Sequence, residues 1–211
     1  MSSGKKEEIA YFMNRLYARG LTTALGGNIS LRNGANSILV TPSGLDKGRV
    51  TAASICEVSN DGRNLSGDLT PSMETSLHLK IYKRRDDIKA VIHAHPPWAT
   101  ILSASNIEIK TNLTGESRFI LGQIANVPYA LMGSEKLAGE VFEAAANRDV
   151  IMIKNHGPVC LGQTLQDAFS KIEALEAAAR TTLFTELLGG ASRLTREQIS
   201  EIDRLREQKR S

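Results

Sequence analysis

Three of the four histidines in this 211-residue chain occupy positions where imidazole rings could bind one metal ion. His93 and His95 lie two residues apart at the end of an apolar run, and in a β-strand this spacing places both side chains on one face. His156 follows a second apolar run, in the sequence Asn-His-Gly-Pro at 155–158, where a turn is expected. Functional residues often lie on such turns at strand ends.

Three imidazoles suit Zn²⁺ and leave its fourth coordination position open, which is the arrangement of catalytic zinc sites. Two simpler interpretations compete: His93 and His95 could be hydrogen-bonded strand residues, or the three histidines could hold a structural zinc. Cys56 and Cys160 lie far apart and form no Cys-x-x-Cys pair. A disulfide framework and a cysteine-based zinc site are therefore excluded, and a reducing, cytoplasmic setting is expected.

Glu74 is the carboxylate to consider beside such a metal. It follows Thr70-Pro71-Ser72-Met73, where Pro71 suits the start of a helix. Either Glu74 is a capping acid that the helix dipole favours, or it is a general base that takes a proton acidified by the metal. His78 lies one turn further along the same predicted helix, and we interpret it as a residue that packs or orients the metal site.

Two glycine-containing turns could bind an anion. Residues 26–30 (GGNIS) and 41–44 (TPSG) both offer backbone N–H groups and hydroxyl donors, which can surround a phosphate. Neither matches the glycine patterns of mononucleotide or dinucleotide binding loops, so ordinary hairpin turns are the alternative.

The elements that must position these residues alternate between helices and strands. The predicted helices cover residues 5–19, 74–84, 98–104, 134–146, 165–188 and 195–209, and the predicted strands cover residues 26–32, 37–41, 55–59, 88–95, 150–153 and 159–161. The pattern predicts an α/β or α+β protein with helices that cover a sheet. Asn33-Gly34 between two β-rich runs predicts a hairpin, so much of the sheet should be antiparallel.

Composition excludes several classes of protein. With 41% hydrophobic and 23% charged residues, the chain should form a packed core, and its length fits one domain over residues 1–211. Lys and Arg exceed Asp and Glu by 26 to 23, an excess of only +3 that predicts no nucleic-acid partner. A polar N-terminus and the lack of any long apolar run predict neither a secretory signal nor a membrane partner.

Five short motifs occur in the order and at separations similar to those of the metal-dependent class II aldolase and adducin head family. They are Gly27-Asn28-Ile29-Ser30, Thr41-Pro42-Ser43-Gly44, Pro71-Ser72-Met73-Glu74 with Leu77-His78, His93-Ala94-His95 and Asn155-His156-Gly157. The chain resembles this family from about residue 7 to residue 188, which is nearly its whole length.

The resemblance implies a three-layer α/β/α domain with a central, largely antiparallel mixed sheet. It also implies a cyclic homotetramer whose active sites lie between neighbouring subunits. One divalent metal per subunit, usually zinc, would be held by His93, His95 and His156, and Glu74 would be the catalytic acid/base. The substrate phosphate would be bound by Gly27, Asn28, Ser43, Gly44 and Ser72.

The reaction implied by the resemblance is cleavage or formation of a ketose 1-phosphate of the fuculose type. Dihydroxyacetone phosphate would chelate the metal, which would stabilise the enediolate formed when Glu74 removes a carbon-bound proton. The enediolate would then add to an aldehyde, and the reverse direction would cleave the sugar phosphate. The lysine Schiff-base mechanism would not be used.

The chain departs from the family pattern at two points. Met73 stands where members often have a second serine as a phosphate donor, and residues 106–118 lack the tyrosine that bacterial members supply there. Glu116 is the polar candidate for a proton donor in that stretch, although a surface glutamate is the simpler interpretation.

Alternatives within and outside the family remain open. Dehydratases and decarboxylases of sugar-acid phosphates share the metal site, whereas 4-epimerases usually carry Asp at the position of Glu74. A non-catalytic interaction module, like the adducin head, would lack the metal residues that this chain retains.

Overall fold

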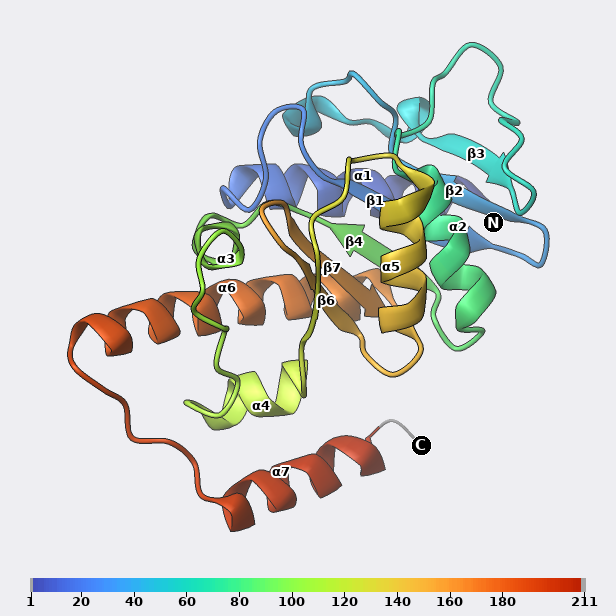
Figure 1. Ribbon diagram of the computed structural model, residues 1–211. Coiled ribbons are helices and arrows are strands. Elements are labelled where there is room, and N and C mark those ends of the chain that lie inside the picture. Colours follow the sequence, from blue (N-terminus) through green and yellow to red (C-terminus); the bar gives the residue numbers. More distant parts are fainter. Residues whose placement is uncertain (1, 210–211) are drawn as a thin grey trace.

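The computed structural model describes residues 2–209, which are built around one seven-stranded sheet (Figure 1). The strand order is β3-β2-β1-β4-β7-β6-β5. The strands are β1 (Asn28–Asn33), β2 (Ser37–Val40), β3 (Cys56–Ser59), β4 (Ala90–His93), β5 (Ala125–Val127), β6 (Val150–Ile153) and β7 (Gly157–Gly162). Every neighbouring pair is antiparallel except β5 with β6, which confirms the prediction of a largely antiparallel mixed sheet.

Helices cover both faces of this sheet. They are α1 (Ser2–Ala18), α2 (Thr75–Arg84), α3 (Pro97–Ser103), α4 (Gly115–Leu121), α5 (Glu135–Ala145), α6 (Leu165–Leu187) and α7 (Arg196–Gln208), with short 3₁₀ turns at Lys47–Arg49 and Ala52–Ser54. One apolar core lies between the sheet and α1, α3, α4 and α6, and a second lies between the sheet and α2 and α5. The fold is therefore the expected three-layer α/β/α sandwich (Figure 1).

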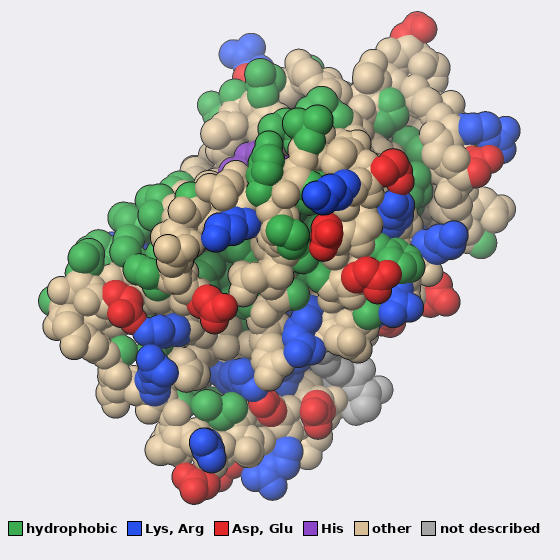
Figure 2. Space-filling model, in the orientation of Figure 1, with side chains coloured by type: hydrophobic (Ala, Val, Ile, Leu, Met, Phe, Trp, Pro, Cys, Tyr) green, Lys and Arg blue, Asp and Glu red, His purple; other side chains and the backbone are tan. Residues whose placement is uncertain are grey.

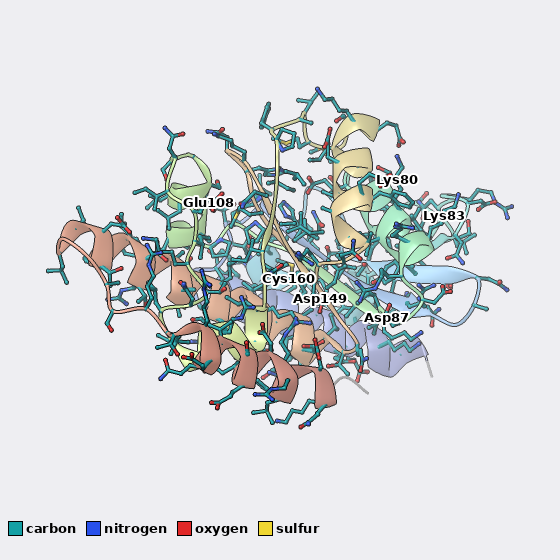
Figure 3. The ribbon with its side chains drawn as sticks, turned by 60° about the horizontal axis from the view of Figure 1, so that its bottom comes forward. Lys80, Lys83, Asp87, Glu108, Asp149 and Cys160 are labelled. Atoms are coloured by element: carbon teal, nitrogen blue, oxygen red, sulfur yellow. The ribbon has the colours of Figure 1, made fainter. Side chains whose placement is uncertain are left out.

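The alternation of side chains along the strands produces these two cores. In β4, Ala90 and Ile92 belong to the core under α1 and α6, whereas Val91 belongs to the core under α2 and α5. On the second face, α2 and α5 are also joined by an ion pair of 2.7 Å between Lys80 Nζ and Glu135 Oε2, and Figure 3 shows Lys80 and Lys83 on α2.

Two elements were not predicted from the sequence, α4 and β5. Both are short and lie in a stretch where apolar and polar residues alternate without a clear period. Thr114 caps α4, because its hydroxyl accepts a hydrogen bond from the Ser117 N–H at 3.1 Å. Ser117 and Leu121 are the buried residues of this helix. The burial of one apolar face against α6 and α7, rather than helix propensity, thus accounts for α4.

The last helix begins at the predicted place. Thr195 and Gln198 form the expected capping box, and α7 packs against α4, where Arg118 Nε donates to Asp203 Oδ1 at 2.7 Å. Within residues 2–209, no helix combines the length and the apolar character needed to cross a membrane.

Candidate active site and metal centre

Three imidazoles converge at one edge of the sheet. His93 is the last residue of β4, His95 lies two residues beyond it, and His156 lies in the tight turn between β6 and β7. The Nε2 atom of His93 is 3.0 Å from that of His95 and 3.2 Å from that of His156. Figure 2 shows histidine surface only as a small purple patch among other side chains, so the rings are largely covered from this side.

The predicted strand over residues 88–95 is longer than the observed one. Strand β4 ends at His93, because its neighbour β1 begins opposite it at Asn28 and Pro96 and Pro97 start the next helix. His95 therefore reaches the site from the irregular segment after β4, not from the same strand face. The observed turn is shorter than the predicted one at 155–158, since β7 already begins at Gly157.

Glycines make the close approach of these segments possible. A Cβ atom on Gly157 would lie 2.5 Å from the Ala94 carbonyl oxygen and 2.9 Å from His95 Cδ2. Gly27 has a φ of +69°, and a Cβ atom there would lie 2.8 Å from the His93 carbonyl oxygen. Gly27, predicted to bind substrate, thus has a packing role that places strand β1 against the metal site.

Hydrogen bonding fixes the tautomer of the central ring. His93 Nδ1 is 2.9 Å from the carbonyl oxygen of Pro158, which can only accept, so Nδ1 carries the proton and Nε2 presents its lone pair. Burial and then the neighbouring histidines lower the pKa of His95 to about 3 and that of His156 to about 4. Both rings are therefore neutral at pH 7, the state that a metal requires of an imidazole ligand.

The donor set fits a divalent metal ion. One atom from each of His93, His95 and His156 lies within 4.8 Å of the others, and lone pairs that meet at this range repel unless a cation lies between them. Within residues 2–209, the buried atoms Glu74 Oε1 and His156 Nδ1 have no hydrogen-bond partner. His93, His95 and His156 could hold a metal ion and leave one of its coordination positions open for an oxygen ligand.

Glu74 immediately precedes α2 and lies beside the imidazoles. Its Oε2 atom is 3.3 Å from His93 Nε2, and its Oε1 atom is 3.8 Å from His156 Nε2. Burial alone would raise the pKa of this carboxyl, but positive charge in the imidazole cluster, at His93 above all, and the hydrogen bond from Asn28 lower it. Glu74 is thus an ionised carboxylate with one oxygen held and one oxygen without a partner in the described chain.

A buried polar network supports Glu74 from behind. Asn28 Nδ2 donates to Glu74 Oε2 at 2.9 Å, and the Asn28 side-chain oxygen lies 2.5 Å from His78 Nε2. The predicted phosphate ligand Asn28 therefore contacts the carboxylate, and His78 is the buried packing residue that its helix position indicated. Ser30 and Tyr82 complete the network. Ser30 was predicted as part of an anion-binding turn, but it is buried and bonded to His78, and the role of Tyr82 was missed. Polar residues at i and i+2 in a buried strand, as at Asn28 and Ser30, were the available signal.

The predicted phosphate turn at 41–44 lies beside the segment that carries Ser72. Pro42 and Pro71 form an isolated bridge, and Ser43 N–H donates to the Thr70 carbonyl oxygen at 2.8 Å. Gly44 has a φ of +69°, which glycine adopts without strain. The Ser72 hydroxyl accepts from the Glu74 N–H at 3.3 Å and keeps its own proton for another acceptor.

Lys47 is a residue near these loops that the sequence reading missed. Its side chain is buried, and its Nζ atom donates to the Pro42 carbonyl oxygen at 2.7 Å. Burial lowers the pKa of this amine, and no carboxylate pairs with it in the described part of the chain. A buried lysine beneath a hydroxyl-rich loop has no signature in a single sequence, since most lysines are exposed.

The two departures from the family pattern, at Met73 and in the stretch that contains Glu116, lie in different parts of the structure. Met73 is 62% exposed, and its carbonyl oxygen lies 3.2 Å from the position of a Cβ atom on Gly133. Its side chain therefore points largely to solvent in the described chain. Glu116 lies in the exposed first turn of α4, on the helix that packs against α7. It has no contact with the imidazoles that would support it as a proton donor.

Acid should destabilise the metal-free protein. His78, like His95 and His156, has a lowered pKa, which burial brings to about 3. Between about pH 6.5 and pH 4.5 the unfolded chain therefore binds more protons than the folded one, so stability falls as pH falls, by up to about 1.4 kcal/mol per pH unit for each histidine. Urea midpoints measured with chelator over this range should decrease steadily. A constant or rising midpoint would show that the buried rings accept protons without penalty.

A three-layer α/β/α fold with three imidazoles and a buried carboxylate at one edge of its sheet is the arrangement of a class II aldolase-type enzyme, a group that typically depends on a metal. The chain belongs to this family, because the family model described as Class II Aldolase and Adducin N-terminal domain matches its residues 7–183. The resemblance inferred from the motifs is confirmed, and the protein is an enzyme of the lyase class.

Relatives within the family carry different names. An L-fuculose phosphate aldolase of Methanocaldococcus jannaschii is 41% identical over 183 residues, covering 87% of this chain and 98% of that protein. A 3-oxo-tetronate 4-phosphate decarboxylase of Escherichia coli O6:H1 is 34% identical over 180 residues, covering 83% and 84%. A solved L-fuculose 1-phosphate aldolase superposes with a TM-score of 0.85 at 28% identity, covering 93% of both chains.

Proposed function

We propose that this protein is a metal-dependent aldolase that cleaves and forms a ketose 1-phosphate of the fuculose-phosphate type, with dihydroxyacetone phosphate and an aldehyde as the other reactants. The observation that carries the proposal is the carboxylate of Glu74, 3.3 Å from His93 Nε2 beside three convergent imidazoles. The relative from M. jannaschii, 41% identical over nearly its whole length, supports this substrate class.

His93, His95 and His156 would hold the metal, for which we propose Zn²⁺ because imidazole ligands suit it. When bound, the ion would supply Lewis acidity that stabilises negative charge on the substrate oxygens. Glu74 removes the carbon-bound proton with Oε1, the oxygen that has no partner in the described chain, while Asn28 holds Oε2. In the reverse direction the same carboxyl returns the proton.

The loops on either side of Glu74 would bind the phosphate. Ser43, Gly44 and Ser72 offer hydroxyl and backbone donors from two segments that the Pro42–Pro71 bridge joins. Neutral donors in these loops would hold the phosphate and so fix the position of the reacting carbon, without placing a second cation beside the metal. In this scheme Asn28 serves the carboxylate first, and its second amide hydrogen remains for substrate.

A screen for retro-aldol cleavage tests the proposal. Phosphorylated ketoses are offered to the purified enzyme with and without chelator, and release of dihydroxyacetone phosphate is followed. We expect cleavage of a ketose 1-phosphate that chelator abolishes and added Zn²⁺ restores. Turnover that is unchanged by chelator, or that never yields dihydroxyacetone phosphate, would contradict the proposal.

A sugar-acid phosphate decarboxylase is the second candidate. The decarboxylase from E. coli O6:H1 is 34% identical over 83% of this chain. Met73 also stands where members of the family often have a second serine as a phosphate donor, so the substrate class is open to this alternative. The same enzyme sample should therefore be offered a 3-oxo acid 4-phosphate, with carbon dioxide as the readout. Release of carbon dioxide together with failure to cleave any ketose 1-phosphate would favour this candidate.

Replacing Lys47 by Met should weaken phosphate recognition. The change removes a charged hydrogen bond to the Pro42 carbonyl oxygen, of a kind that contributes about 1.5–3 kcal/mol, and so loosens the loop that carries Ser43. We expect KM for the phosphorylated ketose to rise about tenfold or more, with kcat/KM for the unphosphorylated ketose unchanged. An equal loss with both substrates would assign Lys47 a purely structural role.

We also infer a homotetramer with active sites at subunit interfaces. Exposed apolar side chains gather in sequence next to Glu74 and Gly133: Met73 is 62% exposed, Tyr129 51%, Leu131 66% and Met132 49%. Such exposure is typical of a surface that another protein covers. Light scattering should give a mass close to four times 22.9 kDa. A monomer at micromolar concentration would contradict this assembly.

A further inference from the structure

A continuous chain of hydrogen bonds runs from the candidate active site into the core beneath α2. Asn28 Nδ2 lies 2.9 Å from Glu74 Oε2, and the Asn28 oxygen lies 2.5 Å from His78 Nε2. His78 Nδ1 lies 2.6 Å from Ser30 Oγ, which lies 2.8 Å from the Tyr82 hydroxyl. All five side chains are buried, and His78 is fully inaccessible to solvent.

Only one assignment of protons satisfies this chain. The Asn28 amide nitrogen donates to Glu74 Oε2, so the amide oxygen faces His78. The His78 Nε2 atom must then donate, and its Nδ1 atom must accept the Ser30 hydroxyl proton. Tyr82 in turn donates to Ser30 at 2.8 Å, and the Lys89 carbonyl oxygen, 3.3 Å from the same hydroxyl, is its second and more distant acceptor. Burial lowers the pKa of His78 to about 3, so the ring is neutral and has one donor and one acceptor, as this assignment requires.

We propose that His78 is a positioning residue for catalysis: by donating to the Asn28 oxygen, it holds the Asn28 amide so that its N–H₂ group faces Glu74 and orients the carboxylate toward the metal site. This inference rests on the proposed role of Glu74 as the proton-transfer group. His78 has no contact with substrate in this scheme, and its effect passes through Asn28 alone.

Loss of the His78 donor should have a specific consequence. The Asn28 amide can rotate by half a turn, which would place its oxygen against the carboxylate of Glu74. Two oxygens at this range repel, so Glu74 would move away from the position 3.3 Å from His93 Nε2. The metal ligands themselves would be unchanged, because none of the three histidines belongs to this hydrogen-bond network.

The test uses three variants of the full-length, metal-loaded enzyme. His78→Leu removes both ring nitrogens at similar volume, and His78→Gln restores an N–H donor and an oxygen acceptor. Ile81→Val, a fully buried change on the same helix, is the control for a general loss of packing. We expect His78→Leu to lower kcat by about 10- to 100-fold with metal content nearly unchanged, the Gln variant to recover most of that loss, and Ile81→Val to match the wild type.

Crystal structures of the same proteins separate this inference from the proposed function. The contact between Asn28 Nδ2 and Glu74 Oε2 should persist in His78→Gln and be lost in His78→Leu. If the contact survives in His78→Leu, or if kcat is unchanged, the positioning role is wrong. If the wild-type enzyme cleaves no ketose 1-phosphate, the proposed function fails, whereas the structures still decide the role of His78. Should His78→Leu not fold, His78→Met removes the same donor.

Discussion

Replacing Glu74 by Gln should leave the fold and the bound metal in place and lower kcat for ketose 1-phosphate cleavage by about 10²- to 10⁴-fold. The amide has the shape of the carboxylate and can still meet the Asn28 side chain, but it cannot accept the carbon-bound proton. The carboxylate lies 3.3 Å from His93 Nε2, where a proton on a substrate carbon near the metal would be in reach. The loss should therefore fall on kcat, since the phosphate donors are untouched.

Metal analysis and steady-state kinetics check this expectation on the same sample. Glu57→Gln is a matched control, because Glu57 is likewise a hydrogen-bonded glutamate, although only half-buried, and accepts from Asn33 Nδ2 at 2.9 Å and Ser37 Oγ at 2.7 Å away from the imidazoles. It should retain wild-type kcat. Wild-type turnover by Glu74→Gln would show that another group takes the proton.

Replacing His93 by Ala should remove the metal. Its Nε2 atom is the one that lies within 3.2 Å of both other imidazole nitrogens, so it is central to the donor set. Two remaining ligands hold a divalent ion poorly, and we expect the metal affinity to fall on the order of a thousandfold or more, with activity following it.

A second variant guards against misfolding of the first, because His93 is almost fully buried and its loss opens a cavity. His95→Ala removes the same kind of ligand from a less buried position, and we expect the same loss of metal. Metal content measured after dialysis against a metal-free buffer, with circular dichroism for the fold, gives the result. Full occupancy in both variants would overturn the assignment of the site.

The convergence of the three histidines was predictable in part. His93 ends one apolar run and His156 follows another, both runs form interior strands of the sheet, and β7 lies between these two strands and pairs with each. The sequence does not indicate the register that pairs His93 with Val159. This register brings the end of β4 next to the turn that carries His156. Register depends on pairing over some 65 residues of sequence, which local patterns do not encode.

The support around the site was harder to predict. His78 was recognisable as a residue near Glu74 because the two are one helical turn apart. Its partners Asn28 and Ser30 come from a strand far away in sequence, and Lys47 lies beneath a loop that only the tertiary fold places above it. The roles of the metal ligands, of Glu74 and of the phosphate loops stay predictions, as does the single domain over residues 1–211.

Proton exchange on dihydroxyacetone phosphate tests the central claim most directly. The enzyme is incubated with this compound in D₂O without any aldehyde, and the signals of the hydroxymethyl hydrogens are followed by NMR. We predict stereospecific loss of one hydrogen with the metal-loaded wild type, and none with Glu74→Gln or with chelator. Exchange at the wild-type rate in Glu74→Gln, or no exchange in the metal-loaded wild type, would contradict the account.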